Sequence, residues 1–317
     1  MAVAFTFPGQ GSQAVGMGKD LAEAFPEARR VFEEVDDALG EKLSTLIWEG
    51  PEETLTLTAN AQPALMAVSL AALRALEARG LSLKDKVAYV AGHSLGEYSA
   101  LAASGFVSVA DAARLLRARG NAMQAAVPAG EGAMAAIIGL EQADVEAACA
   151  EAAKSSARGA VCQVANDNGG GQLVISGARA AVELAARLCT EKGAKRALML
   201  QVSAPFHSAL MAPAADIMRE ALANVAKRTP VVPVVSNVTV TPTSDPDEIA
   251  RRLVQQVTGR VRWRETVEWF GQNGVSTLYE VGAGKVLSGL ARRINRDIAT
   301  GAIGTAAEVE AALAALG

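Results

Sequence analysis

One pentapeptide, Gly92-His93-Ser94-Leu95-Gly96, constrains this chain more than any other feature of its sequence. It lies between a short apolar run, residues 87–91, and a helix-forming stretch, residues 97–101. In that setting the pattern G-x-S-x-G predicts a nucleophile elbow, in which the glycines leave room for a sharp turn and the serine oxygen stands above a sheet. The N–H of the next residue is then free to bind an oxyanion. Ser94 is therefore the candidate nucleophile and Leu95 a candidate oxyanion donor.

Many glycine and serine turns only join a strand to a helix, so the elbow needs a second observation, and the histidines supply one. A serine hydroxyl needs a base at neutral pH, and histidine is the commonest one. The chain has only two histidines. His93 is adjacent to Ser94, so its side chain is expected to point away from the serine oxygen and form part of a pocket wall. His207, in a loop-like stretch, is therefore the candidate base, although a lone histidine without Ser94 would be taken for a packing residue.

The bulk properties exclude some classes of function. At 317 residues, half of them hydrophobic, the chain can bury one large core or two domains. A net charge of −4 gives no broad positive field, so no nucleic-acid partner is expected. Two local basic clusters, Arg260/Arg262/Arg264 and Arg292/Arg293/Arg296, indicate either solvated helix faces or a docking surface for an acidic partner.

The three cysteines are widely spaced and form no C-x-x-C pair, so the sequence predicts neither a disulfide framework nor a zinc site. Reduced, partly buried thiols are expected instead. The first residues lack the features of a signal peptide, and no apolar run reaches membrane-spanning length. We therefore expect no membrane association and a cytoplasmic location.

Strand and helix patterns alternate in the first part of the chain. A strand at 3–7 is followed by a glycine-rich loop and helices to about residue 80, and a strand at 87–91 by helices to about 127. Such alternation predicts a parallel sheet covered on both faces. A proline and two glycines in 128–132 then predict a hinge.

The segment after the hinge has the order βαββαβ, which is typical of a ferredoxin-like unit. Its expected elements are a strand at 133–138, a helix at 142–153, strands at 161–165 and 172–176, a helix at 178–192 and a strand at 196–201. The alternation of helices and strands seen in the first part of the chain then resumes, with a helix at 208–225 and strands at 231–235 and 277–281. These patterns predict a discontinuous large domain, residues 1–128 and 203–317, with a small domain, residues 129–202, inserted in it. Ser94 and His207 flank the insertion, so the pocket is expected between the two domains.

Two other glycine-rich segments are weaker signals. Residues 9–14 fit G-x-G-x-x-A, but the acidic residue that a dinucleotide fold needs at the end of its second strand is missing. Residues 282–285 lack the first glycine of a phosphate-binding loop. The loop at 7–13 is better explained as the source of a second oxyanion N–H, that of Gln10.

Six motifs then occur in order along the chain. They are Phe7–Gln13, Gly92–Ala100, Arg119-Gly120, Gly132–Ala136, Pro205–Ser208 and Tyr279–Gly282. Together they resemble the bacterial malonyl-CoA:acyl-carrier-protein transacylases, an acyltransferase family, over nearly the whole chain. The resemblance implies an α/β fold with an α/β-hydrolase-like large domain, built on a parallel sheet, and an inserted ferredoxin-like small domain.

The resemblance also implies a mechanism. Ser94 attacks the thioester of malonyl-CoA, His207 takes the proton, and the N–H groups of Gln10 and Leu95 hold the oxyanion. The phosphopantetheine thiol of acyl carrier protein then takes the malonyl group from Ser94 in a ping-pong exchange that supplies fatty acid synthesis. No metal or other cofactor is needed, and a monomer is expected.

By the same resemblance, Arg119 selects the acyl group, because a planar guanidinium can hold the malonyl carboxylate through two parallel hydrogen bonds. The residue pattern alone does not choose among Arg114, Arg117 and Arg119. The resemblance places a main-chain carbonyl of Gln256 behind His207, where a catalytic triad would have an acid.

The resemblance further places Asn166 at the pocket and gives Phe206 the role of excluding a branched methylmalonyl group. The loop around Asn166 departs from the family, which usually has an aromatic residue where this chain has Asp167 and Ser-Pro where it has Gly169 and Gly170. More glycine predicts a looser loop.

Three alternatives stay open. A serine thioesterase would deliver the acyl group to water and would need a carboxylate partner for its histidine. An acyltransferase acting in trans for a polyketide synthase would use the same chemistry with another carrier. A non-catalytic carrier-binding protein is disfavoured because Ser94, His207 and Arg119 are all present.

Overall fold

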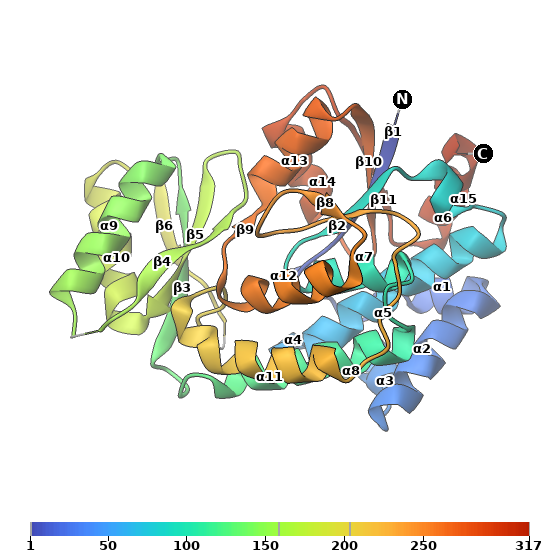
Figure 1. The fold of residues 1–317 in the computed structure, drawn as a ribbon, viewed down its shortest axis with the longest axis horizontal. Helices are drawn as coiled ribbons and strands as arrows, with labels where there is room; N and C mark the ends of the chain where they lie inside the picture. Colours follow the sequence, from blue (N-terminus) through green and yellow to red (C-terminus); the bar gives the residue numbers. More distant parts are fainter. Residues whose placement is uncertain (1, 158, 203, 317) are drawn as a thin grey trace.

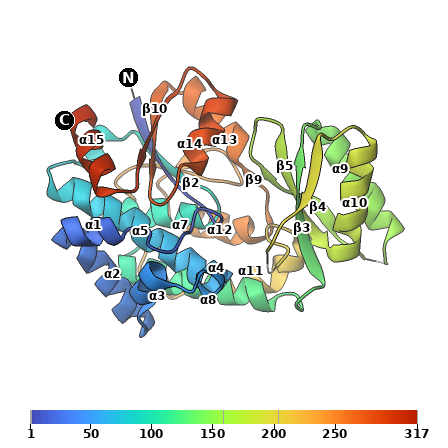
Figure 2. The same ribbon diagram turned by 180° about the vertical axis from the view of Figure 1, so that it is seen from behind.

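The structure is a computed structural model that describes residues 2–157, 159–202 and 204–316. The expected domain boundary at residue 203 and both chain ends lie outside the described residues. Figures 1 and 2 show a mixed α/β molecule with a larger sheet at one end and a smaller sheet, backed by two helices, at the other. No described helix is both long and apolar enough to cross a membrane.

The larger sheet, as far as the described residues show, has the strand order β11-β10-β1-β2-β7-β8. Its strands are β1 (Ala2–Phe7), β2 (Tyr89–Gly92), β7 (Val234–Val235), β8 (Pro242–Thr243), β10 (Val275–Val281) and β11 (Ala299–Ile303). Neighbouring strands are parallel except for β7 and β8. The parallel arrangement expected from the alternation of strands and helices is thus confirmed.

The larger part of the chain contributes helices that pack on the two faces of this sheet or on one another. They are α1 (Lys19–Ala24), α2 (Pro26–Leu39), α3 (Leu43–Glu49), α4 (Glu52–Thr56), α5 (Thr58–Ala78), α6 (Leu83–Lys86), α7 (Leu95–Ala103), α8 (Val109–Ala125), the short 3₁₀ turn η1 (Ala209–Met211), α11 (Ala212–Ala223), α12 (Pro246–Thr258), α13 (Trp263–Gln272), α14 (Val286–Ile294) and α15 (Ala306–Leu316). Alternate side chains of β1 face opposite ways, as a strand requires. Phe5 and Phe7 join the apolar cluster of α2, α5, α7 and α8, whereas Ala4 joins that of α13 and α14.

The smaller sheet has the order β6-β3-β5-β4-β9 among the described residues. Its elements are β3 (Gly132–Ile138), α9 (Gln142–Ser155), β4 (Cys162–Asp167), β5 (Gln172–Ala178), α10 (Arg179–Glu191), β6 (Arg196–Met199) and, from much later in the chain, β9 (Val261–Arg262). Helices α9 and α10 lie on the side away from the larger sheet (Figure 1). The expected βαββαβ order is present, and its buried face is formed by Ala133, Ala135 and Ile137 of β3 together with both helices.

The expected set of strands was incomplete in several places. The strand expected at 231–235 is only Val234–Val235, because the Val231 N–H donates to the Ser104 carbonyl (2.8 Å) outside the sheet and Pro233 has no N–H to donate. Strands β8 and β11 were not expected, and neither was strand β9. It is two residues long and pairs in parallel with β4, so the smaller sheet takes its edge strand from the later part of the chain.

The cysteines behave as expected. Cys149, Cys162 and Cys189 are all buried and unpaired, and they belong to the apolar cluster of the smaller sheet. Among the described residues no group of histidine, cysteine and acidic side chains has the arrangement of a metal site.

Candidate active site

Ser94 occupies a strained turn between β2 and α7. Its backbone has φ 54° and ψ −110°. Residues other than glycine rarely adopt this conformation, and it often marks a functional site. A Cβ on Gly92 would lie 1.9 Å from the Gly96 carbonyl carbon, and one on Gly96 would lie 2.2 Å from the Phe7 oxygen. Both positions therefore require glycine, and the elbow expected from the pentapeptide is formed.

Asn237, in the loop between β7 and β8, holds this turn on both sides. Its Oδ1 accepts from the Ser94 N–H (2.8 Å), and its Nδ2 donates to the Gly92 carbonyl (2.7 Å). Its own N–H donates to the buried Glu97 carboxylate (3.1 Å). The strained backbone is thus fixed by a residue 143 positions away, for which the sequence carried no signal.

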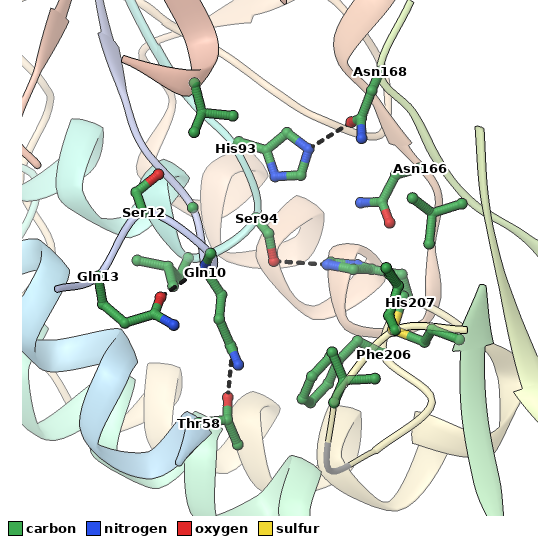
Figure 3. A pocket seen from close by; sticks show the side chains of 18 of the residues that line it. Gln10, Ser12, Gln13, Thr58, His93, Ser94, Asn166, Asn168, Phe206 and His207 are labelled. Carbon is green, nitrogen blue, oxygen red and sulfur yellow. Dashed lines mark hydrogen bonds between the residues drawn. The ribbon is translucent and has the colours of Figure 1, made fainter. Parts of the chain in front are cut away.

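Ser94 and His207 meet as expected, and Figure 3 shows their side chains pointing at each other. The Ser94 Oγ lies 2.6 Å from His207 Nε2. On the other side of the ring, Nδ1 lies 2.9 Å from the Gln256 carbonyl oxygen and 3.1 Å from that of Gly259. A carbonyl can only accept, so Nδ1 carries the proton and Nε2 is free to take one from the serine hydroxyl. The carbonyl that the resemblance placed behind His207 is in that position.

The His207 imidazole is held neutral. Burial, followed by the nearby Arg119 cation, lowers its pKa to about 3. Burial also lowers the pKa of His93. A neutral imidazole is the form that can act as a base, so His207 is ready to accept a proton at any pH above its lowered pKa.

Arg119 lies on the buried face of α8 and reaches the dyad. Its Nη1 donates to Gln62 Oε1 (2.7 Å), and its Nη2 donates to Gln256 Oε1 (2.9 Å) and to Ser94 Oγ (3.1 Å). These acceptors are uncharged, and Nε has no hydrogen-bond partner among the described residues. The guanidinium also lies over the Tyr98 ring. It is therefore a buried cation, next to the candidate nucleophile, whose hydrogen-bond partners carry no negative charge.

The other two arginines of this helix do not reach the pocket. Arg114 pairs with Asp111 at the surface, and Arg117 contacts Asn60 and Glu41. Helical spacing could have made the distinction, because Arg119 falls on the same face as Ala112, Leu116 and Met123, which are all buried. Gln62, which holds Arg119 from α5, was missed.

The Gln256 side chain connects Arg119 with the turn that carries Ser94. Its Oε1 accepts from Arg119, while its Nε2 donates to the Ser94 carbonyl (2.9 Å) and to the Glu97 carboxylate (2.8 Å). Burial raises the pKa of the Glu97 carboxyl to about 7, although hydrogen bonds from Asn237 and Gln256 oppose the rise. The sequence pointed only to the Gln256 carbonyl, so this use of its side chain and the role of Glu97 were missed.

The dyad opens into a cavity of about 370 Å³ between the two sheets, within the usual size range of small-molecule sites. The predicted residues Gln10, His93, Leu95 and Asn166 line it, as does Phe206. Wall residues come from the loop after β1, from α5 and α8, and from β4 and β5 of the smaller sheet. The pocket therefore lies between the two sheets, where the insertion placed it.

The two candidate oxyanion donors lie close to Ser94. Leu95 is the first residue of α7, so its N–H has no acceptor one turn earlier in the helix and lies at the positive end of the helix dipole. The loop that carries Gln10 packs directly on the elbow, because a Cβ on Gly9 would lie 2.7 Å from the His93 oxygen. The Gln10 side chain turns away to accept a hydrogen bond from Thr58 (2.9 Å), as Figure 3 shows.

His93 points away from Ser94, as expected. Its Nε2 lies 2.9 Å from Asn168 Oδ1, and its ring packs against Trp263. Asn168 belongs to the loop between β4 and β5, where the glycines predicted a looser chain. That loop is instead a hydrogen-bonded turn, with the Asn168 N–H donating to Gln172 and the Gln172 N–H to Gly169, both at 3.0 Å.

Comparison with known proteins agrees with this architecture. The acyl transferase domain family matches residues 4–294. The malonyl CoA-acyl carrier protein transacylase of Bacillus subtilis (strain 168) is 47% identical over 314 residues, which are 99% of this chain and 97% of that protein. The crystal structure of an acyl-carrier-protein-S-malonyltransferase from Bartonella henselae superposes with a TM-score of 0.97 at 64% identity, covering 100% of this chain and 99% of that one. A solved complex of a type II PKS acyl-carrier protein with its malonyl-transacylase matches with a TM-score of 0.95 at 44% identity, covering 99% of this chain and 100% of that one.

The lowered pKa values of the two histidines can be measured directly, because the chain has no other histidine signals. Burial lowers both pKa values, that of His207 to about 3. In NMR spectra of ring-labelled histidine, we expect the His207 C2–H shift to stay constant from about pH 8 down to about pH 5 and the His93 shift to titrate below the ordinary histidine value. A His93→Gln variant assigns the remaining signal to His207. A His207 shift with a midpoint near the ordinary histidine value would contradict this account of the base.

Proposed function

The chain belongs to the acyl transferase family, and we propose that it transfers a malonyl group from malonyl-CoA to the phosphopantetheine thiol of acyl carrier protein through a malonyl ester of Ser94. The observation that carries this proposal is the buried Arg119 cation, hydrogen-bonded to the oxygen of the candidate nucleophile (3.1 Å). An acyltransferase dyad needs no cation at that place for an uncharged acyl group. A cation there fits an acyl group that ends in a carboxylate.

In the first half-reaction, Ser94 Oγ attacks the thioester carbonyl of malonyl-CoA while His207 Nε2 takes its proton. The N–H groups of Leu95 and Gln10 stabilise the oxyanion of the tetrahedral intermediate. The carbon–sulfur bond then breaks, His207 returns the proton to the leaving sulfur, and CoA departs. Ser94 is left as a malonyl ester.

The second half-reaction repeats these steps with a different nucleophile. The carrier thiol gives its proton to His207 as its sulfur attacks the ester carbonyl. The carbon–oxygen bond to Ser94 breaks and Ser94 regains its proton from His207, so the enzyme returns to its starting state. Both protons pass through the same neutral imidazole.

Arg119 acts on the malonyl carboxylate throughout. Its Nη1 and Nη2 are held by Gln62 and Gln256, which orient the guanidinium without neutralising it. A malonyl carboxylate would give the guanidinium a negatively charged hydrogen-bond partner, whereas an acetyl group would leave Arg119 with uncharged acceptors and only the electrostatic influence of the nearby Glu97 carboxyl. His93 and Asn166 line the acyl pocket, and the Phe206 ring leaves little room for a branched methylmalonyl group.

We assign the larger part of the chain, residues 1–128 and 203–317, to an α/β-hydrolase-like domain, and residues 129–202 to a ferredoxin-like one. The parallel sheet with its elbow and the βαββαβ order support this division. A monomeric enzyme in the cytoplasm that needs no cofactor and supplies fatty acid synthesis remains our prediction.

Two alternatives use the same nucleophile. A polyketide pathway is the nearer one, because a structural relative is a type II PKS malonyl-transacylase in complex with its carrier. The choice between pathways depends on the carrier and not on the dyad. A thioesterase is less well supported, because the partners of His207 Nδ1 are two main-chain carbonyls and not a carboxylate.

The covalent intermediate tests the proposal. Mixed with malonyl-CoA and no carrier, the protein should gain the mass of one malonyl group, and peptide mapping should place it on Ser94. Adding acyl carrier protein should remove it. Ser94→Ala should gain no mass and His207→Ala should acylate far more slowly. Steady release of free malonate and CoA without a stable adduct would indicate a thioesterase instead.

Selectivity tests the role of Arg119. Arg119→Ala should lower kcat/KM for malonyl transfer by about 100-fold, the loss expected when a charge-assisted hydrogen-bond pair disappears, and should lower acetyl transfer much less. Arg117→Ala is the matched control, since this side chain is on the same helix but contacts Asn60 and Glu41 outside the pocket. Equal losses with malonyl-CoA and acetyl-CoA in Arg119→Ala would show that the arginine does not recognise the carboxylate.

A further inference from the structure

Strand β9, from the later part of the chain, joins the smaller sheet by pairing with β4, and we call this short pairing the seam. Asn166 lies beside Val261 and Asp167 beside Arg262 in this parallel pairing. The seam is only two residues long on each strand, and β4 is the strand that carries Asn166 into the pocket. The position of this pocket wall therefore depends on whatever holds the seam together.

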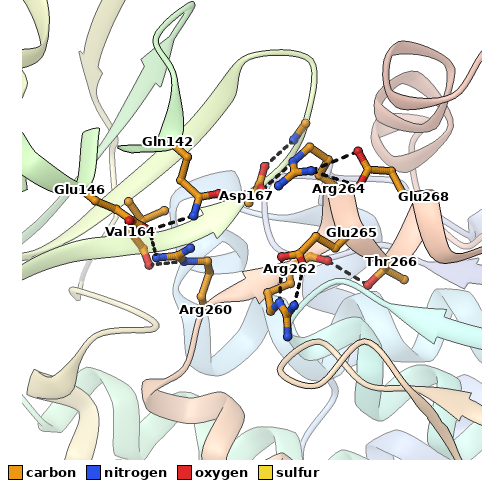
Figure 4. A network of polar contacts seen from close by, with 11 residues as sticks. Gln142, Glu146, Val164, Asp167, Arg260, Arg262, Arg264, Glu265, Thr266 and Glu268 are labelled. Carbon is orange, nitrogen blue, oxygen red and sulfur yellow. Dashed lines mark hydrogen bonds and ion pairs between the residues drawn. The ribbon is translucent and has the colours of Figure 1, made fainter. Parts of the chain in front are cut away.

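Arginine side chains reinforce the seam at both ends, as Figure 4 shows. Before β9, Arg260 donates to Glu146 of α9 (2.6 Å) and to the Val164 carbonyl of β4 (3.3 Å). After β9, the Nε of Arg264 donates to Asp167 Oδ2 (2.8 Å). All three bonds run from the later part of the chain to β4 or to α9, which backs the smaller sheet.

The arginine between them behaves differently. The Arg262 side chain turns back to Glu265 on α13 and to the Val238 carbonyl, so its side-chain contacts lie outside β4 and α9. Each member of this basic cluster therefore has an acidic partner within the chain. The cluster was expected to be a solvated face or a docking surface. Its side chains are partly exposed, and its first and last arginines also connect the segment around β9 to α9 and β4.

Asp167 occupies a special place in this seam because successive side chains of a strand face opposite ways. The register of the pairing between β4 and β5 shifts between Val164 and Asn166. This bulge determines which side of the sheet the following side chains face. Asn166 and Asn168 face the pocket, and Asp167 between them faces Arg264. An interaction that holds Asp167 on one side of the strand therefore also fixes Asn166 and Asn168, whose side chains face the pocket on the other side.

The Asp167 carboxylate uses its two oxygens for two tasks. Oδ1 accepts from the Gly169 N–H (3.2 Å) and closes the turn, while Oδ2 accepts from Arg264. The side chain is only 4% exposed, whereas that of Arg264 is 37% exposed and also contacts Glu268. A buried carboxylate that lost its cation would be strongly disfavoured, so the bond to Arg264 resists any outward movement of the strand.

We propose that Asp167 and Arg264 form an anchor that holds the end of β4 against α13 and so keeps Asn166 and Asn168 on the acyl pocket, which makes Asp167 a positioning residue for acyl-group binding. Through Asn168 the anchor also fixes the His93 ring, whose Nε2 lies 2.9 Å from Asn168 Oδ1. The anchor touches neither Ser94 nor His207. It therefore acts on binding of the acyl donor and not on the proton transfers. The expected effect on binding of the acyl donor rests on the proposed function.

A double-mutant cycle with malonyl-CoA and acyl carrier protein tests the anchor. Asp167→Asn keeps an oxygen for the Gly169 N–H but replaces the carboxylate that faces Arg264. Arg264→Gln removes the cation from a half-exposed position and keeps the helix. For each variant we expect the KM for malonyl-CoA to rise about fivefold with kcat nearly unchanged, an effect typical of residues that act through their neighbours. The double variant should match either single variant.

A matched control and a second readout separate positioning from general loss of stability. Glu265→Gln removes a charge from the neighbouring ion pair with Arg262, whose side chains do not hydrogen-bond to β4, and should leave the KM unchanged. Amide hydrogen exchange at Asn168 and Gln172, whose N–H groups close the turn, should become faster in Asp167→Asn and Arg264→Gln but not in the control.

Two results would overturn the anchor. One is a KM within about twofold of the wild type in both single variants, and the other is a double variant whose effect is the product of the two single effects, as for independent sites. Failure of the proposed function looks different, because the wild-type protein would then form no malonyl ester on Ser94. In that case the exchange rates at Asn168 and Gln172 still decide whether the anchor exists.

Discussion

The buried hydrogen-bond network of Gln256 is the constraint on which the rest of the site depends. Its main-chain carbonyl fixes the proton on His207 Nδ1, its Oε1 holds Arg119, and its Nε2 holds the backbone of Ser94. One residue of α12 thus orients the base, the cation and the nucleophile. The three polar groups of Gln256 are all hydrogen-bonded, and buried hydrogen bonds of this kind resist movement because an unpaired buried group is costly. The dyad is therefore organised before any substrate arrives.

Burial sets the chemistry of the two central groups in complementary ways. It removes the proton from His207, which leaves a neutral base, and the charge of Arg119 adds to this effect. It cannot remove the proton from an arginine, so Arg119 remains a cation whose hydrogen-bond partners are uncharged. The free pocket is thus complementary to an acyl group with a negative end. The same electrostatic environment accounts for both the reactivity of Ser94 and the selection of the group that it receives.

The sequence predicted those features that local patterns encode. The elbow at Ser94 follows from glycines placed between a strand and a helix, and His207 follows because the chain has only one other histidine. Arg119 needed the family resemblance, although the buried face of α8 distinguishes it. Asn237 and strand β9 could not be predicted, because each acts through contacts between segments far apart in the chain. The turn after Asp167 was expected to be loose because of its glycines, and the ion pair of Asp167 with Arg264, 97 residues away, could not be predicted.

One variant separates the role of the Gln256 main-chain carbonyl from that of its side-chain amide, and its kinetics are the most direct test of the network. Gln256→Met keeps the main-chain carbonyl that orients His207 and fills the space of the side chain, but it removes the amide that holds Arg119. We predict that kcat/KM for malonyl transfer falls at least about tenfold more than that for acetyl transfer, since a misplaced guanidinium loses its charge-assisted bonds to the carboxylate. An unchanged ratio of the two rates would contradict the claim that this network couples the dyad to the choice of acyl group.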